Sequence, residues 1–218
     1  MPSFRATLNS ETEPRAPEGT RAPRRPRRGF LVELGVYVGR IREFSREDWI
    51  VYVSWVGLML GLVFATGGFL LVGHQNGVRY PVEAWLLPVG AVIFAVSIAV
   101  DTIGHRTIYK EEIGKAEGLV HHITIASGIA SSVLLCIAYS SPAGVWIVAL
   151  VMTALSFLYS LIDEAFHWRR YVRKDSDRVE MWSHVGILTG HSILMVSWWW
   201  WFFHGYAGVR ETLTYLPL

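Results

Sequence analysis

The sequence predicts an all-α integral membrane protein, a bundle of five transmembrane helices with a cytoplasmic N-terminus and a preceding interfacial helix. Three observations support this fold class. The composition is too apolar for an ordinary soluble domain: 52% of the 218 residues are hydrophobic, 17% are charged, and the mean hydropathy is +0.33. Five apolar windows are long enough to cross a bilayer, and Lys and Arg concentrate in alternate connections between those windows.

Each apolar window approaches the length of about 20 residues that a helix needs to cross the hydrocarbon. The windows run from Trp49 to Gly73, Trp85 to Gly104, Leu119 to Tyr139, Val145 to Ile162 and Val185 to Phe203. We therefore expect five spans joined by short connections.

The basic residues predict the orientation of the spans, because cytoplasmic loops carry the excess of Lys and Arg. Three segments hold most of them: the N-terminal arm (Arg21, Arg24, Arg25, Arg27, Arg28, Arg40, Arg42), the second loop (Arg106, Lys110, Lys115) and the fourth loop (Arg169, Arg170, Arg173, Lys174, Arg178). The remaining connections are nearly free of charge. This distribution predicts a multi-pass protein of a bacterial inner membrane or equivalent, with the C-terminus opposite the cytoplasm.

The chain before the first span divides into two parts. Residues 1–28 are rich in Pro and Arg and poor in apolar side chains, which predicts a disordered basic cytoplasmic arm. Residues 29–44 resemble an amphipathic segment lying on the membrane surface, although an irregular linker would also fit so short a pattern. Ser45 and Asp48 have the spacing of a capping box, which predicts the start of the transmembrane domain, residues 45–218.

Histidine and carboxylate residues gather at the cytoplasmic ends of the spans. Asp101 and His105, Asp163 and His167, and Glu180 and His184 are each four residues apart, so each pair shares one face of a helix. Glu164 and His167 have the E-x-x-H spacing of di-iron helical bundles. Ionisable groups at such depth need a partner, a water-filled cavity or a bound ion. The less specific alternative is a solvated rim in which Asp101 pairs with Arg106, and Glu164 with Arg169 or Arg170.

We predict that these groups bind metal. A dinuclear site draws its ligands from about two turns of each helix, which separates the candidates into two sets. The predicted ligands are Asp101, His105, His121, His122, Glu164, His167 and His184. The second set contains residues that are either further ligands or groups that orient a metal-binding imidazole. Its members are Glu112, Asp163, Glu180 and His191.

The ligand types favour two iron ions as the cofactor. Mixed carboxylate and imidazole groups suit iron, manganese or zinc, and suit copper less well. Cys136 is the single cysteine, which excludes iron–sulfur clusters, and its position within an apolar window predicts a buried packing role. Haem b, zinc and copper remain alternatives.

The layout of a cytoplasm-facing, histidine-rich site on membrane spans resembles that of the integral-membrane desaturases and hydroxylases. The motifs differ, because those enzymes carry H-x-x-x-H and H-x-x-H-H boxes, whereas this chain has one double histidine, His121-His122, and no H-x-x-x-H pair. Glu180 and His184 also have the acid-x-x-x-His form found on spans of particulate copper monooxygenases. Neither resemblance covers enough of the chain to assign a family.

Taken together, the sequence predicts a di-metal oxidoreductase of the monooxygenase, hydroxylase or desaturase type that acts on a lipid or other apolar substrate at the cytoplasmic side. We expect membrane lipid, an apolar substrate and an electron-donor protein as partners, and no nucleic acid. Three alternatives stay open: a b-type haem subunit of a respiratory or photosynthetic complex, a zinc-dependent membrane hydrolase, and a structural subunit. The structural subunit is suggested by the Trp198–Trp201 run, which could contact neighbouring membrane subunits, and by the small-residue pairs Gly57/Gly61 and Gly186/Gly190.

Overall fold

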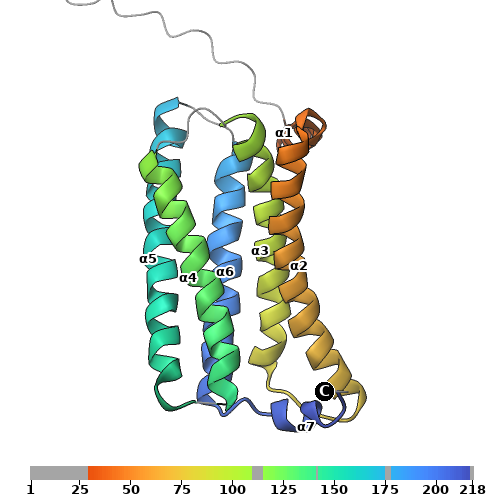
Figure 1. Cartoon of the computed structure of the whole chain (residues 1–218). Coiled ribbons are helices and arrows are strands. Elements are labelled where there is room, and N and C mark those ends of the chain that lie inside the picture. The colour runs from red at the N-terminus through yellow and green to blue at the C-terminus, as the bar shows by residue number, and fades with distance from the viewer. Residues whose placement is uncertain (1–28, 110–114, 141, 175–177, 217–218) are drawn as a thin grey trace, which may run out of the picture.

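The computed structural model describes residues 29–109, 115–140, 142–174 and 178–216, and this part of the chain contains helices and no strand. Among the described residues, helices α2 to α6 are the long ones, and they stand side by side in alternating directions (Figure 1). The elements are α1 (Phe30–Gly39), the 3-10 helix η1 (Arg40–Glu43), α2 (Arg46–Gln75), α3 (Val82–Thr107), α4 (Lys115–Ser140), α5 (Pro142–Lys174), α6 (Arg178–Phe203) and α7 (Val209–Leu213). The prediction of a helical bundle is confirmed, and the predicted disordered arm lies outside the described residues.

Four of the helices are long and apolar enough to cross a membrane. These candidate spans are Arg46–Gln75, Val82–Thr107, Gly118–Ser140 and Gly144–Arg169. Helix α6 contains the fifth predicted window and is as long as α3, but its hydropathy is reduced by two His and by the run of four Trp. The protein is thus a helical bundle with the character of a multi-pass integral membrane protein.

Helix α6 is the most enclosed of the long helices because α3 packs closely along it. A Cβ atom on Gly190 would lie 2.5 Å from the backbone nitrogen of Phe94, and one on Gly90 would lie 2.5 Å from that of Leu194. Both distances are too short for any side chain, so glycine at these positions sets the separation of α3 and α6. The close helix contact that the small-residue spacing predicts is therefore present at Gly190, between two helices of the same chain. Gly57 and Gly61 instead face open space.

The end of the bundle that carries α1 is held by polar and aromatic contacts. Tyr37 of α1 is buried against Gly104 and Ile103 of α3 and Val179 of α6. The predicted capping box is present, with the Asp48 backbone donating to Ser45 Oγ and the Ser45 backbone donating to Asp48 Oδ2. Helix α1 thus closes the bundle at the end where α3 finishes and α6 begins.

Three of the four consecutive tryptophans pack inside the opposite end of the bundle. Trp198 donates to the hydroxyl of Tyr206 (3.2 Å), Trp199 to Thr153 Oγ1 (3.0 Å) and Trp201 to the carbonyl of Ala207 (3.0 Å). Only Trp200 of the run is exposed. Burial raises the pKa of Tyr206, whose hydroxyl donates to the Leu135 carbonyl. The Trp run therefore packs mainly within the chain. Contact with a neighbouring subunit stays a prediction, and within the run Trp200 is the residue exposed for it.

Candidate metal centre

Four long helices bring histidine and carboxylate side chains together at the α1 end of the bundle. Helix α3 contributes Asp101 and His105, which lie near its C-terminus; α4 contributes His121, near its start. The side chains from α5 and α6 are Asp163, Glu164, His167, Glu180 and His184. The alternating directions of the helices place these groups at one level, as the sequence predicts.

Three imidazoles form the middle of this cluster. One ring nitrogen from each of His105, His167 and His184 lies within 4.8 Å of the others, an arrangement able to hold a metal ion. Bonds from such an ion to nitrogen are about 2.0–2.1 Å long, so three nitrogens on one ion lie about 3.3–3.5 Å apart. The three side chains would therefore move toward one another to bind a single ion together.

Two carboxylates complete the cluster, one on each side. Asp101 lies between His105 and His184, with Oδ2 3.4 Å from His105 Nε2 and Oδ1 3.0 Å from His184 Nε2. Asp163 lies between His121 and His167, with Oδ2 3.3 Å from His121 Nδ1 and Oδ1 3.8 Å from His167 Nε2. Each carboxylate therefore faces two imidazoles.

Several polar atoms of the cluster are buried and face one another without a well-aligned hydrogen bond among the described residues. They include Asp101 Oδ1, His105 Nε2, Asp163 Oδ1 and His184 Nε2, each of which lies 3.0–3.8 Å from a carboxylate or imidazole atom of the cluster. Buried polar atoms in folded proteins are nearly always hydrogen-bonded. A set of imidazole nitrogens and carboxylate oxygens that face one another in this way is able to coordinate a cation.

Two glutamates contact the Nδ1 atoms of His167 and His184, on the side of each ring away from its Nε2. His184 Nδ1 lies 3.1 Å from Glu164 Oε1, and His167 Nδ1 lies 3.0 Å from Glu180 Oε1. An N–H donated from Nδ1 fixes the tautomer and leaves the Nε2 lone pair for a metal, as in carboxylate–histidine–metal arrangements. Glu180 is predicted as a ligand or as an orienting carboxylate, and its contact is that of an orienting carboxylate. Glu164 is predicted as a ligand, but it makes the same kind of contact with His184.

The remaining predicted residues divide between the cluster and its surroundings. The double histidine separates: His121 faces Asp163, whereas His122 is exposed and its Nδ1 lies 2.5 Å from the Gly118 carbonyl of its own helix. Consecutive helical residues point about 100° apart, so only one of the two can turn inward. Glu112 lies outside the described residues.

The alternative of a solvated rim does not match the contacts of Asp101 and Arg106. Arg106 forms an ion pair with Asp48 of α2, to which its Nε donates at 2.6 Å. Asp101 is 4% exposed and faces imidazoles rather than guanidinium. The arginine therefore ties α2 to α3 and leaves the Asp101 carboxylate to the cluster.

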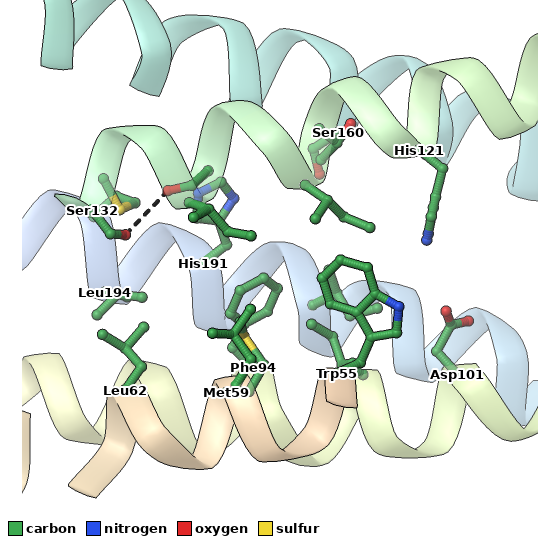
Figure 2. Close-up of a pocket in the computed structure, with 18 of the residues that line it drawn as sticks. Trp55, Met59, Leu62, Phe94, Asp101, His121, Ser132, Ser160, His191 and Leu194 are labelled. Atoms are coloured by element: carbon green, nitrogen blue, oxygen red, sulfur yellow. Dashed lines mark hydrogen bonds between the residues drawn. The ribbon is translucent and has the colours of Figure 1, made fainter. Parts of the chain in front are cut away.

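An apolar cavity of about 500 Å³ extends from the cluster along the bundle. Figure 2 shows Asp101 and His121 at one end, Trp55, Phe94 and His191 further along, and Leu62, Leu194 and Ser132 toward the other end. The volume is in the range of small-molecule sites. Sequence periodicity carries no direct signal for this cavity. The spacing of Gly57 and Gly61 predicts helix packing, whereas both residues line the cavity.

His191 lies in the cavity wall, apart from the cluster. Its ring is stacked between those of Phe94 and Phe157, with centroids 5.5 and 4.5 Å away, and its Nε2 is 3.4 Å from Ser156 Oγ. It follows His184 by two turns on the same helix face, about 10 Å along the axis. Of the second set of predicted residues, His191 therefore lines the cavity and does not contact the cluster.

Fold and site together define the chain as a helical bundle of membrane-protein character with a buried histidine–carboxylate cluster at one end of an apolar cavity. Comparisons with models of known protein families, with characterised proteins and with solved structures give no significant match.

Proposed function

We propose that this protein is a membrane oxidoreductase that binds two metal ions, preferably iron, and oxidises a lipid or other apolar substrate. The observation that carries the proposal is the convergence of buried imidazole and carboxylate groups at the end of an apolar cavity. Metal ions supply the redox chemistry, and the cavity supplies an apolar binding site beside them.

The proposal includes five spans with the N-terminus in the cytoplasm. Helix α6 is long enough to cross and is enclosed by its neighbours, which reduces the hydropathy that it needs toward lipid. The basic connections are those at the α1 end, and the positive-inside rule assigns that end to the cytoplasm. A reductant from the cytoplasm would then reach the cluster from the nearest side.

The two most closely packed helix pairs each supply one set of ligands for an ion. Helices α3 and α6 carry Asp101, His105 and His184; helices α4 and α5 carry His121, Asp163 and His167. Each set contains two histidines and one carboxylate. That combination, with open coordination positions, is typical of non-haem iron(II) sites that use oxygen. It supports iron over copper and a dinuclear centre over a single ion.

The proposed reaction is a two-electron oxidation that uses molecular oxygen. In a hydroxylation, one C–H bond of the substrate breaks, and one oxygen atom of O₂ forms the new C–O bond. The other oxygen atom leaves as water, with two electrons from a donor protein and two protons. Glu164 and Glu180 hold the imidazoles in place, and the apolar walls exclude water from the reacting carbon.

A haem has less support than small ions. Axial histidines lie on opposite faces of the macrocycle, whereas the rings of His167 and His184 are in direct contact, with centroids 3.6 Å apart. The zinc hydrolase retains one specific observation in its favour, since three histidines around one point can also hold a zinc-activated water.

The test is oxygen-isotope incorporation by iron-loaded protein in lipid nanodiscs, supplied with a chemical reductant and ¹⁸O₂. We expect one ¹⁸O atom per product in the lipid fraction, loss of this product in Asp163→Asn, and its retention in His122→Ala. Products that carry oxygen from labelled water alone, formed by zinc-loaded protein without reductant, would support the hydrolase instead. Absence of any labelled product with either metal would contradict both oxygenation and hydrolysis of the membrane lipid.

A further inference from the structure

The apolar cavity has a defined direction relative to the membrane. On α4, its lining runs from His121 to Val133, a distance of about 18 Å along the helix axis. His121 lies three residues inside the start of the candidate span Gly118–Ser140, and His167 lies two residues before the end of the candidate span Gly144–Arg169. The cluster is therefore near one membrane surface, and the rest of the cavity extends toward the middle of the bilayer.

The cavity opens sideways between α2 and α4. Among the described residues, these two helices have no Cα atoms within 8 Å of one another, although both line the cavity. On the α2 side the exposed lining includes Gly57 and Gly61, where an added Cβ would meet nothing within 4 Å. On the α4 side it includes Ile129 and Val133. The two glycines thus leave an apolar opening at the depth of the lipid tails.

Gly128 on α4 widens the cavity from the other side. A Cβ atom at this position would lie 4.0 Å from the Cβ of Ser156, which is ordinary contact, so the helix packing does not require glycine there. Small residues on both walls therefore enlarge the cavity without being needed for helix contact.

We propose that the occupant of this cavity is a single acyl chain, with its head-proximal carbons at the metal cluster and its tail toward Leu194. The acyl-chain proposal names the substrate class of the proposed function. Its statement about which carbon is oxidised rests on that function. The polar head of a lipid stays at the membrane surface, because transfer of a charged or hydrogen-bonding group into hydrocarbon is costly. Since the cluster is at that surface, the carbons nearest the head are those that reach it. Oxidation then falls near the head group and not at the methyl end.

The direction of the chain is tested with acyl chains that carry a photoreactive diazirine at either end. The full-length protein is placed in nanodiscs with a phosphatidylcholine or a free fatty acid, labelled near the head or near the terminal methyl, irradiated, and mapped by peptide mass spectrometry. The head-proximal label is expected to modify residues around Trp55, His121 and Ile125. The terminal label is expected to modify residues around Leu62, Ser132 and Leu194. The amount of label on the cavity residues is compared between the phosphatidylcholine and the free fatty acid, which shows which of the two enters the cavity.

A cavity-filling variant and its matched control show whether labelling comes from the cavity. Gly61→Leu adds a side chain at the opening, whereas Gly68→Leu adds the same side chain on the same helix, into space that is also free and does not line the cavity. We expect Gly61→Leu to lower labelling of the cavity residues about tenfold through steric exclusion, and Gly68→Leu to leave it unchanged.

Reversed positions for the two labels, or cavity labelling that is equal in Gly61→Leu and wild type, would overturn the proposal. The measurement is repeated on protein treated with a chelator, so it does not depend on a loaded metal site. If the labelling pattern is as expected but the protein binds no metal, the chain orientation stands and the oxidoreductase function fails. If metal is bound but the cavity is not labelled, the acyl-chain proposal fails alone.

Discussion

At the scale of single residues, the contacts of Glu164 and Glu180 distinguish this cluster from a random gathering of charges. Each glutamate contacts the Nδ1 of a histidine whose Nε2 lies beside an aspartate of the cluster. This is the orientation that carboxylates give to metal-binding histidines.

We predict that Glu164→Gln and Glu180→Gln weaken metal binding by about 10–100-fold without abolishing it, because glutamine retains the size of glutamate but holds the imidazole less strongly. The affinity is measured by competition with a chromophoric chelator. Glu43→Gln, on the exposed surface of η1, is the control and should bind as wild type does. Equal affinities in all three variants would contradict the orienting role.

The residue types of the site could be predicted from the sequence, but their roles could not. The four-residue spacings predict shared helix faces, and the structure brings the side chains of those faces together. The choice between His121 and His122 depends on the rotation of α4, and the contact of Glu164 with His184 depends on the approach of α5 to α6. Neither is encoded in local periodicity. The prediction that Cys136 is buried was wrong, because that face of α4 points outward.

At the scale of helices, Gly90 and Gly190 fix the contact between α3 and α6. Since α3 carries Asp101 and His105 and α6 carries His184, this contact also sets the distance between the ligands of one proposed ion. All five helices were predicted from their apolar windows. Helices α5 and α6 extend beyond those windows because their polar ends continue the helix through the cluster.

We predict that Gly190→Ala lowers stability by about 1–3 kcal/mol, because its Cβ would lie 2.5 Å from the Phe94 backbone and force α3 and α6 apart. Thermal unfolding in detergent, followed by circular dichroism, measures the loss. Gly68→Ala adds the same methyl group where nothing lies within 4 Å and serves as the control. A Gly190→Ala protein as stable as this control would contradict the packing account.

At the scale of the whole molecule, the bundle has α1 at one end and α7 at the other (Figure 1). The cluster lies at the α1 end, where α3 finishes and α6 begins. The basic residues near the cluster end predict that this end faces the cytoplasm. The sequence predicts this sidedness, but the arrangement of helices alone is compatible with either orientation.

We predict that a cysteine at Glu211 is labelled by a membrane-impermeant maleimide in intact spheroplasts, and that one at Glu43 is labelled only after the membrane is opened. Both positions are exposed, they lie at opposite ends of the bundle, and the substitutions are made in a Cys136→Ala background. The reverse labelling pattern would invert the topology. Labelling of both sites in intact spheroplasts would contradict five spans.

The central claim is that the buried histidines and aspartates bind metal, and the most direct measurement is the metal content of the purified protein. Elemental mass spectrometry and an absorption spectrum are recorded on protein in mild detergent. We predict about two iron ions per chain without a Soret band, strong loss of iron in His184→Ala and His167→Ala, and no loss in His122→Ala. A metal-free wild-type protein, a Soret band, or equal metal content in His184→Ala and His122→Ala would contradict the account.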